Sequence, residues 1–310
     1  MKSPNNTTEP CWGEFPSKQR QAELRQRIQV WAQEDDHGDQ PGPFAEFKLT
    51  GADIFWLVAW VAGGEDAEAG KASLDKYQHG VGLSVRVDLS DLPLDGASLY
   101  RAHLENAQLF RVQLRSASLY GAYLEGADLG EAQLQHANLF EAQLQQAKLS
   151  RAQMQGANLN KAQMEGADLN TAQLEGANLT EAHLQRANLQ WTQLQNARLH
   201  NTYFQRAALR WTQLQGADLT YCDLRGADLR SARLDINTIL DRTRLDDQVH
   251  LADVAWNGSS LSRVDWEAVP RLGDEVNPGS DESPRDAARA YRQLAVALRE
   301  QGITEAADRY

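Results

Sequence analysis

The stretch GADLGEAQLQHANLF, residues 126–140, contains the pattern that decides the fold. A small residue, a polar residue and a leucine are followed by two variable positions, and the five-residue unit then begins again. The pattern stays in phase from Ala97 to Leu234, which makes 28 units, with alanine at the small position in 23 and leucine at the third position in 25. Such regularity indicates a stacked array of short units and not a conventional globular core.

A period of five residues excludes both ordinary kinds of secondary structure. Leucines five residues apart would be spread around an α-helix, since each residue turns the helix by about 100°. A plain strand fails because its side chains alternate with a period of two. The chain must therefore turn once per unit, and a square coil of four units buries every alanine and leucine while Asp168 and its equivalents face water. Twenty-eight units then make about seven coils, a rod of about 34 Å at ~4.8 Å per coil.

These units, together with GANLTEAHLQRANLQ at residues 176–190, resemble the pentapeptide-repeat family. The resemblance covers nearly half of the chain and implies an all-β solenoid, a right-handed quadrilateral β-helix of about seven coils. Glutamine at the polar position of many alternate units departs from the family pattern and gives a ten-residue superperiod on the surface. After Leu234 the phase slips by one residue, and we expect the β-helix to cover residues 85–251.

The N-terminal flank, residues 1–84, is predicted to be a helical cap. Residues 17–31 form a candidate helix, and two shorter candidates follow at 53–62 and 65–76.

The C-terminal flank divides into two parts. Residues 252–282 are expected to form an irregular cap and a linker, with Trp256 and Trp266 as a lid over the apolar end of the last coil. Residues 283–310 are predicted to be helical, and the last helix is cut short by the chain end at Tyr310. We therefore expect a fragment of a longer protein.

The helix AYRQLAVALREQG, residues 290–302, gives a second resemblance, to the soluble N-terminal part of bacterial multidomain pentapeptide-repeat proteins. In that group such a helix leads into a membrane channel-like module, which implies that the chain is the soluble part of a larger, membrane-tethered protein. Quinolone-resistance relatives dimerise through a C-terminal element packed end to end. A cap over that end predicts a monomer or a weak dimer here.

Composition excludes several classes of protein. Cys11 and Cys222 are the only two cysteines, too few for a disulfide scaffold or a cysteine-rich zinc fold, so a reduced cytoplasmic setting is expected. The longest apolar run, residues 54–62, is far shorter than the roughly 20 residues of a membrane span, so we predict no membrane span. A net charge of −12 makes direct nucleic-acid binding unlikely.

Motifs that carry chemistry are missing from the sequence. GEDAEAGK at residues 64–71 has five residues between its glycines where a phosphate loop has four, and Ala72 replaces the expected serine or threonine. His37 has no partner histidine nearby, and His103 and His183 lie four coils apart, on the order of 19 Å. We predict no catalytic, cofactor-binding or metal-binding residues, no cofactor and no enzyme activity.

Outward aromatic residues form the candidate interaction surface. Tyr100, Tyr120 and Phe140 recur every 20 residues, and Trp191 and Trp211 do the same. Two interpretations stay open. Either these columns only stabilise neighbouring coils, or they form strips that bind a partner.

Charge along the coil tests one function attributed to some relatives, which are thought to inhibit or protect DNA gyrase by imitating a negative DNA duplex. Residues 95–234 contain 13 acidic and 13 basic residues, so the negative charge lies in the flanks. A mimic needs acids along its rod. We therefore predict a non-enzymatic rigid scaffold or protein-interaction module with an unknown protein partner. The alternative is a DNA-mimicking modulator of gyrase or topoisomerase.

Overall fold

The computed structural model describes residues 17–32, 53, 89–276 and 284–310. Apart from Asp53, the candidate helix expected at 53–62 lies outside these ranges, as do the candidate helix at 65–76, the GEDAEAGK segment and His37. The first candidate helix is present as α1, Lys18–Ala32. Arg20 of α1 donates from Nε and Nη2 to the carboxylate of Asp53, at 3.2 and 3.1 Å.

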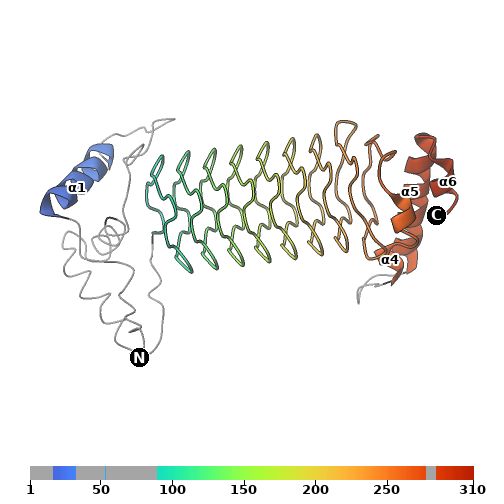
Figure 1. The fold of residues 1–310 in the computed structure, drawn as a ribbon, viewed down its shortest axis with the longest axis horizontal. Helices are drawn as coiled ribbons and strands as arrows, with labels where there is room; N and C mark the ends of the chain where they lie inside the picture. Colours follow the sequence, from blue (N-terminus) through green and yellow to red (C-terminus); the bar gives the residue numbers. More distant parts are fainter. Residues whose placement is uncertain (1–16, 33–52, 54–88, 277–283) are drawn as a thin grey trace, which may run out of the picture.

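A four-sided β-helix forms the body of the molecule (Figure 1). The outward polar residue of each unit makes a parallel bridge to the residue 20 positions later, as Ser98 does to Ser118. The amide of Leu169 donates to the carbonyl oxygen of Asn188 at 2.7 Å, and the amide of Asp168 donates back to Ala147 at 2.9 Å. Because each bridge spans four units, four short segments make one turn of the coil.

Tight turns make the corners between the four sides. In one of them the amide of Ala172 donates to the carbonyl oxygen of Leu169 at 2.9 Å, and Thr171 has a φ of +58°. A positive φ at the third turn residue is typical of a type II turn, where glycine is favoured. From residue 91 to residue 231, the third residue of every turn has a positive φ. At most of these turns that residue is not glycine, so its backbone is strained.

The interior of the repeats holds the small residues and the leucines of the units, with Met154, Met164 and Phe204 at three of the leucine positions. Ala167 and Leu169 are fully buried, whereas Asp168 between them is partly exposed. Several inward small positions hold a hydroxyl or thiol: Thr192, Thr202, Thr212, Cys222, Thr238 and Thr243. Each donates to the carbonyl oxygen of a leucine in the preceding coil, at 2.8 to 3.0 Å. The hydroxyl or thiol group at each of these six positions therefore has a hydrogen-bond partner inside the rod.

The rod extends further than the sequence pattern indicated. Bridges continue past residue 251, from Arg233 to Ala255 and from Ile239 to Ser260, so residues 252–260 belong to the β-helix and not to an irregular cap. Thirty-four bridged residues, four to a coil, make eight and a half coils, about 41 Å at ~4.8 Å per coil. The later coils are longer by one or two residues, as between Asp228 and His250, which hides them from a five-residue search.

Four short or medium helices follow the last coil: η1 (Trp266–Ala268), α4 (Gly273–Val276), α5 (Pro284–Glu300) and α6 (Thr304–Ala307). Figure 1 shows α4, α5 and α6 packed together against the C-terminal end of the rod. Leu294 and Leu298 of α5 are fully buried with the core. The irregular cap and linker expected at 252–282 are also wrong near residue 272, since Leu272 is fully buried and α4 follows it directly.

Trp256 directly follows the bridged Ala255 and so belongs to the last coil, not to a lid over it, whereas Trp266 lies beyond that coil and packs against Trp256. Their ring centroids are 6.5 Å apart in an edge-to-face arrangement, and Trp266 donates from Nε1 to the carbonyl oxygen of Leu261 at 3.0 Å. Both line an apolar cavity of about 20 Å³ closed by leucines of the last coils. In the parts of the chain that the structure describes, no helix has the length and apolar character needed to cross a membrane.

Candidate interaction surface

The first aromatic column, Tyr100, Tyr120 and Phe140, stacks along one edge of the rod. Ring centroids are 5.4 Å apart for Tyr100 and Tyr120 and 5.1 Å apart for Tyr120 and Phe140. Tyr100 is 52% exposed, whereas the other two rings are partly buried. Arg101 lies 5.5 Å from the Tyr100 ring centroid, a cation–π contact. Among the described residues, Tyr100 is therefore the most exposed ring of this column.

The second column, Trp191 and Trp211, stacks more closely. The ring centroids are 4.6 Å apart and the planes lie within 8° of parallel. Trp191 is 52% exposed and Trp211 36% exposed. Both residues occupy the strained third turn position, with φ of +61° and +58°. A bulky side chain in this conformation is unusual, because glycine or asparagine fits there with less strain.

The structure does not bring the two columns together. Successive corners are five residues apart and a coil has four of them, so Trp191 lies two corners on from the edge that carries Tyr100. The columns therefore occupy diagonally opposite edges. They also belong to different coils, so one compact ligand cannot contact both.

Three further ring pairs on the rod were missed by the sequence analysis, one of them His200 and Tyr221, which meet edge to face with centroids 5.4 Å apart. His103 stacks on Tyr123 with centroids 4.4 Å apart, and His183 lies 4.7 Å from Tyr203. All four occupy the bridged position of one face. The signal was present, since the members of these two pairs are 20 residues apart, but His103 and His183 were considered only as possible metal ligands. Tyr203 is 37% exposed and adds an aromatic surface to this face.

Carboxylates on the later coils are held ionised by arginines. Burial alone would raise the pKa of Asp223, but hydrogen bonds from Arg225 at 2.8 and 2.6 Å outweigh it and hold that pKa below its ordinary value. Asp95, in the first coil, shows the opposite balance: burial raises its pKa and the nearby Arg115 only partly compensates. Neither group has the partner set of a general acid or base.

Other reactive groups in the described ranges are arranged for structure. Burial raises the pKa of the Cys222 thiol, which donates to the carbonyl oxygen of Leu199 and is fully buried, so it is not a nucleophile at neutral pH. Within the same ranges no group of three or more histidine, cysteine or acidic residues is placed to hold a metal ion.

Comparisons with known proteins agree with the repeat. The profile of the family described as Pentapeptide repeats (8 copies) matches residues 86–125, 107–142, 137–172, 172–210 and 207–235. No match was found among curated proteins.

Several solved structures are similar to this chain. HetL, a pentapeptide repeat protein involved in heterocyst differentiation regulation from the cyanobacterium Nostoc sp. strain PCC 7120, is 30% identical, with 61% of this chain and 84% of HetL covered and a TM-score of 0.28. QnrB1, a plasmid-mediated fluoroquinolone resistance protein, is 15% identical, with 69% and 94% covered and a TM-score of 0.38. A pentapeptide repeat protein from the thylakoid lumen of Arabidopsis thaliana is 21% identical, with 36% and 68% covered and a TM-score of 0.23.

Three findings support the same assignment. The five-residue units stay in phase and match the family profile, the bridges join residues 20 positions apart, and the sequence is 30% identical to HetL with 84% of HetL covered. The chain belongs to the pentapeptide-repeat family.

Proposed function

We propose that this protein is a non-enzymatic, rigid scaffold that binds a protein partner through side chains on the outside of its β-helix. The interior is filled by alanine and leucine, so the coil has no internal site for a substrate. The backbone of each coil is bonded to the next, which makes the rod stiff. Binding is therefore expected on the exposed edges.

The Trp column carries this proposal. Trp191 is half exposed and occupies a turn position where its side chain costs backbone strain. Stacking on Trp211 compensates for part of that cost, but a glycine would avoid the strain altogether. Strained side chains are common at the corners of this rod, so what distinguishes this column is its pair of parallel, exposed indoles, which favours contact with a partner.

The test removes both indoles and measures stability and binding separately. In the Trp191→Ala/Trp211→Ala double variant, lost stacking of about 1 kcal/mol should lower Tm by only a few degrees. Chemical cross-linking in the source cell should then fail to trap the protein adduct that wild type forms. Thr171→Ala, at the same edge one coil away, is the matched control and should keep the adduct. An adduct retained by the double variant would overturn the binding role of this column.

A further inference from the structure

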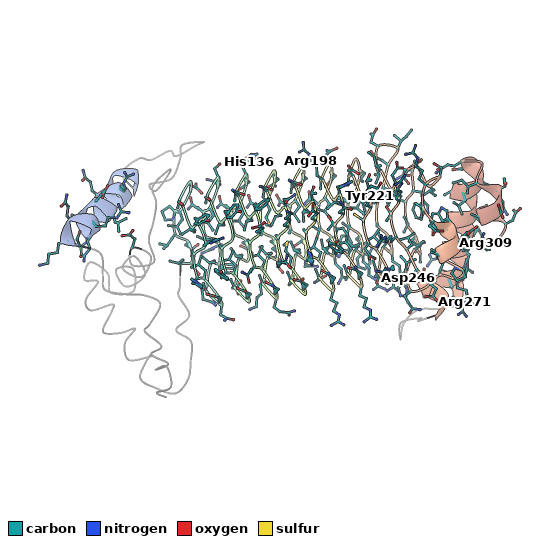
Figure 2. The ribbon with its side chains drawn as sticks, viewed as in Figure 1. His136, Arg198, Tyr221, Asp246, Arg271 and Arg309 are labelled. Atoms are coloured by element: carbon teal, nitrogen blue, oxygen red, sulfur yellow. The ribbon has the colours of Figure 1, made fainter. Side chains whose placement is uncertain are left out.

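A cleft of about 460 Å³ opens where the last coil meets the C-terminal cap. Four arginines line it: Arg225, Arg242, Arg244 and Arg263. Arg225 and Arg244 come from two successive coils, since Asp223 bridges Arg244, and Arg263 follows the last bridged residue, where its carbonyl oxygen accepts from the amide of Arg242. Tyr221, labelled in Figure 2 near the C-terminal end of the rod, lies beside this cleft in contact with Arg242.

Two of the four guanidinium groups pair with carboxylates of the rod. Arg225 makes two hydrogen bonds to Asp223, and Arg263 donates to Oδ2 of Asp241 at 2.7 Å. Both arginine side chains remain more than half exposed. Because a guanidinium has five N–H donors, each keeps donors available on its exposed side.

The other two arginines have no carboxylate partner in the described ranges. Arg242 donates to the hydroxyl of Tyr221 at 2.7 Å and lies 5.4 Å from its ring centroid. Arg244 is exposed, and no hydrogen bond or ion pair of its side chain occurs within the described residues. Four carboxylates lie near the four arginines: Asp223, Asp241, Asp246 and Asp265. Their charges balance in sum, but none of the four pairs with Arg244 within the described residues, so its guanidinium suits one added carboxylate.

The last coil shows what such a carboxylate would bind. In the body of the rod the amide that follows each bridged residue donates to the next coil. Beyond the last coil the described residues form no further coil to accept these hydrogen bonds, and on two faces a side-chain oxygen accepts them instead. The amide of Leu251 donates to Oδ2 of Asp274 at 2.7 Å, and the amide of Leu261 donates to Oε1 of Gln301 at 2.7 Å. Side-chain oxygens therefore complete the final rung of the β-helix on these two faces.

On the other two faces the equivalent amides belong to Leu245 and Trp256, and neither has a hydrogen-bond partner among the described residues. Of the two, only Leu245 lines the arginine cleft. Leu245 is buried, and an unpaired buried amide is costly. A carboxylate oxygen bound here would accept from Leu245 as Asp274 does from Leu251, while Arg244 binds the other oxygen.

We propose that the arginine cleft binds an aspartate or glutamate side chain of an acidic segment in a partner protein. Arginine matches the planar carboxylate with paired hydrogen bonds, and the cleft is large enough for a short stretch of peptide. The proposal rests on the proposed function, since it names the chemistry of a partner, but it uses a different surface from the Trp column.

The test uses two rhodamine-labelled peptides, Gly-Gly-Glu-Glu-Gly-Gly and its Gln-Gln counterpart, and fluorescence anisotropy on the full chain. The Glu peptide should bind at least tenfold more tightly than the Gln peptide, and added salt should weaken it. Arg244→Gln should cost at least tenfold in affinity. Arg198→Gln is the matched control, because Arg198 is an exposed arginine at a bridged position of an earlier coil and on another face of the rod (Figure 2), and should change affinity less than twofold.

Three results would overturn the proposal. The first is equal loss with both variants, which would mean unspecific attraction. The second is equal binding of the two peptides. The third is full displacement by millimolar inorganic phosphate with no displacement by free glutamate, which would assign the cleft to phosphate.

Hydrogen exchange gives an independent readout. A saturating concentration of the Glu peptide should slow exchange at the Leu245 amide and leave mid-rod amides unchanged; unaltered exchange at Leu245 would contradict the assigned contact. The Trp191→Ala/Trp211→Ala variant should bind the Glu peptide like wild type. A result against the cleft proposal can therefore be distinguished from a result against the Trp column proposal.

Discussion

At Ala197 the interior has no space for a larger side chain. Ala177 and Ala217 occupy the same position one coil below and one coil above, at a spacing of about 4.8 Å, and all three are buried. Overpacking in such a site costs roughly 1–3 kcal/mol, sometimes more. We therefore expect Ala197→Leu to lower the free energy of unfolding by at least that amount in urea denaturation.

The matched control is one residue away. Arg198 faces outward, is exposed, and makes no side-chain hydrogen bond within the described residues. Arg198→Leu adds a similar apolar side chain on the outside and should change stability by at most ~0.5 kcal/mol. Equal losses at Ala197 and Arg198 would show that the inward and outward positions are misassigned.

Asp228 predicts how stability depends on pH. Burial would raise its pKa, but Arg230 and Arg210 outweigh burial and hold that pKa below its ordinary value. The closest contacts include Arg230 Nε at 2.7 Å and Arg210 Nε at 2.8 Å. A depressed folded-state pKa stabilises the folded state fully above the unfolded value of about 3.9 and progressively less as the pH falls through the folded pKa.

Asp228→Asn should therefore cost about 1–2 kcal/mol at pH 7, where it removes charge-assisted hydrogen bonds. The difference from wild type should shrink towards zero by about pH 2, where the wild-type carboxyl is also protonated. Urea denaturation at the two pH values measures both. The same difference at both pH values would show that the ion pairs at Asp228 add nothing to stability.

Most of what a single residue does in this fold could be predicted from its place in the five-residue unit. The inward positions follow from the period alone, since only one coil geometry buries every alanine and leucine. Asp168 shows the limit. It was expected simply to face water, but it accepts hydrogen bonds from Ser150, Asn170 and Asn188. Two of these partners lie 18 and 20 residues away, and their side-chain geometry is not contained in the repeat.

The C-terminal cap is held to the rod by a close backbone contact at Gly273. A Cβ atom there would lie 2.4 Å from the backbone oxygen of Gln248, so the two backbones could not approach as they do. The amide of Gly273 donates to Val249 at 2.7 Å. Gly273 also positions Asp274, which accepts from the amide of Leu251 at the last rung.

Gly273→Ala should therefore displace α4 and cost about 2 kcal/mol or more, because backbone cannot move aside as a flexible side chain would. Hydrogen exchange should accelerate at Leu251 and Ala252 and stay unchanged in mid-rod coils. Gly302→Ala is the control: its φ is +74° but no atom lies within 4 Å of the added Cβ, so only backbone strain of about 1 kcal/mol is expected. Unchanged exchange at Leu251 in the Gly273 variant would rule out this mode of attachment.

The cap and the cleft were the parts that the sequence could not predict. The units after residue 234 have extra residues, so their period no longer reads as five and the last coil was taken for an irregular lid. The segment with Asp274 is polar and contains glycine, which favoured a linker, yet the carboxylate of Asp274 is buried against two backbone amides. The arginine cleft depends on side chains from two coils and the segment that follows them, and on where the ladder stops, neither of which a repeat pattern contains.

At the scale of the whole molecule, the cap decides whether rods can associate end to end. Leu294 and Leu298 of α5 are fully buried, as are Leu261 and Leu272. Removing residues 271–310 would uncover this apolar end and the amides that the cap satisfies. In sedimentation velocity we expect the full chain to be a monomer and the shortened chain to self-associate. A dimer of the full chain that is independent of concentration and survives the deletion would contradict this.

Charge is also a property of the whole rod. Residues 95–181 contain 10 acidic and 6 basic residues, whereas residues 182–234 contain 3 and 7. The first part of the rod is therefore acidic and the middle part basic, whereas residues 235–265, which surround the arginine cleft, contain 6 acidic and 3 basic residues. A duplex imitation requires negative charge along its full length, and this distribution favours a scaffold with distinct docking places.

A DNA gyrase supercoiling assay with the purified full chain tests this distinction between a scaffold and a topoisomerase-directed DNA mimic most directly. We predict that supercoiling continues at the rate of the untreated enzyme, and that quinolone-stabilised cleavage is unchanged, up to a severalfold molar excess of the chain over gyrase. Inhibition of supercoiling, or protection of gyrase from the drug, in the same concentration range would contradict the scaffold function and establish the mimic.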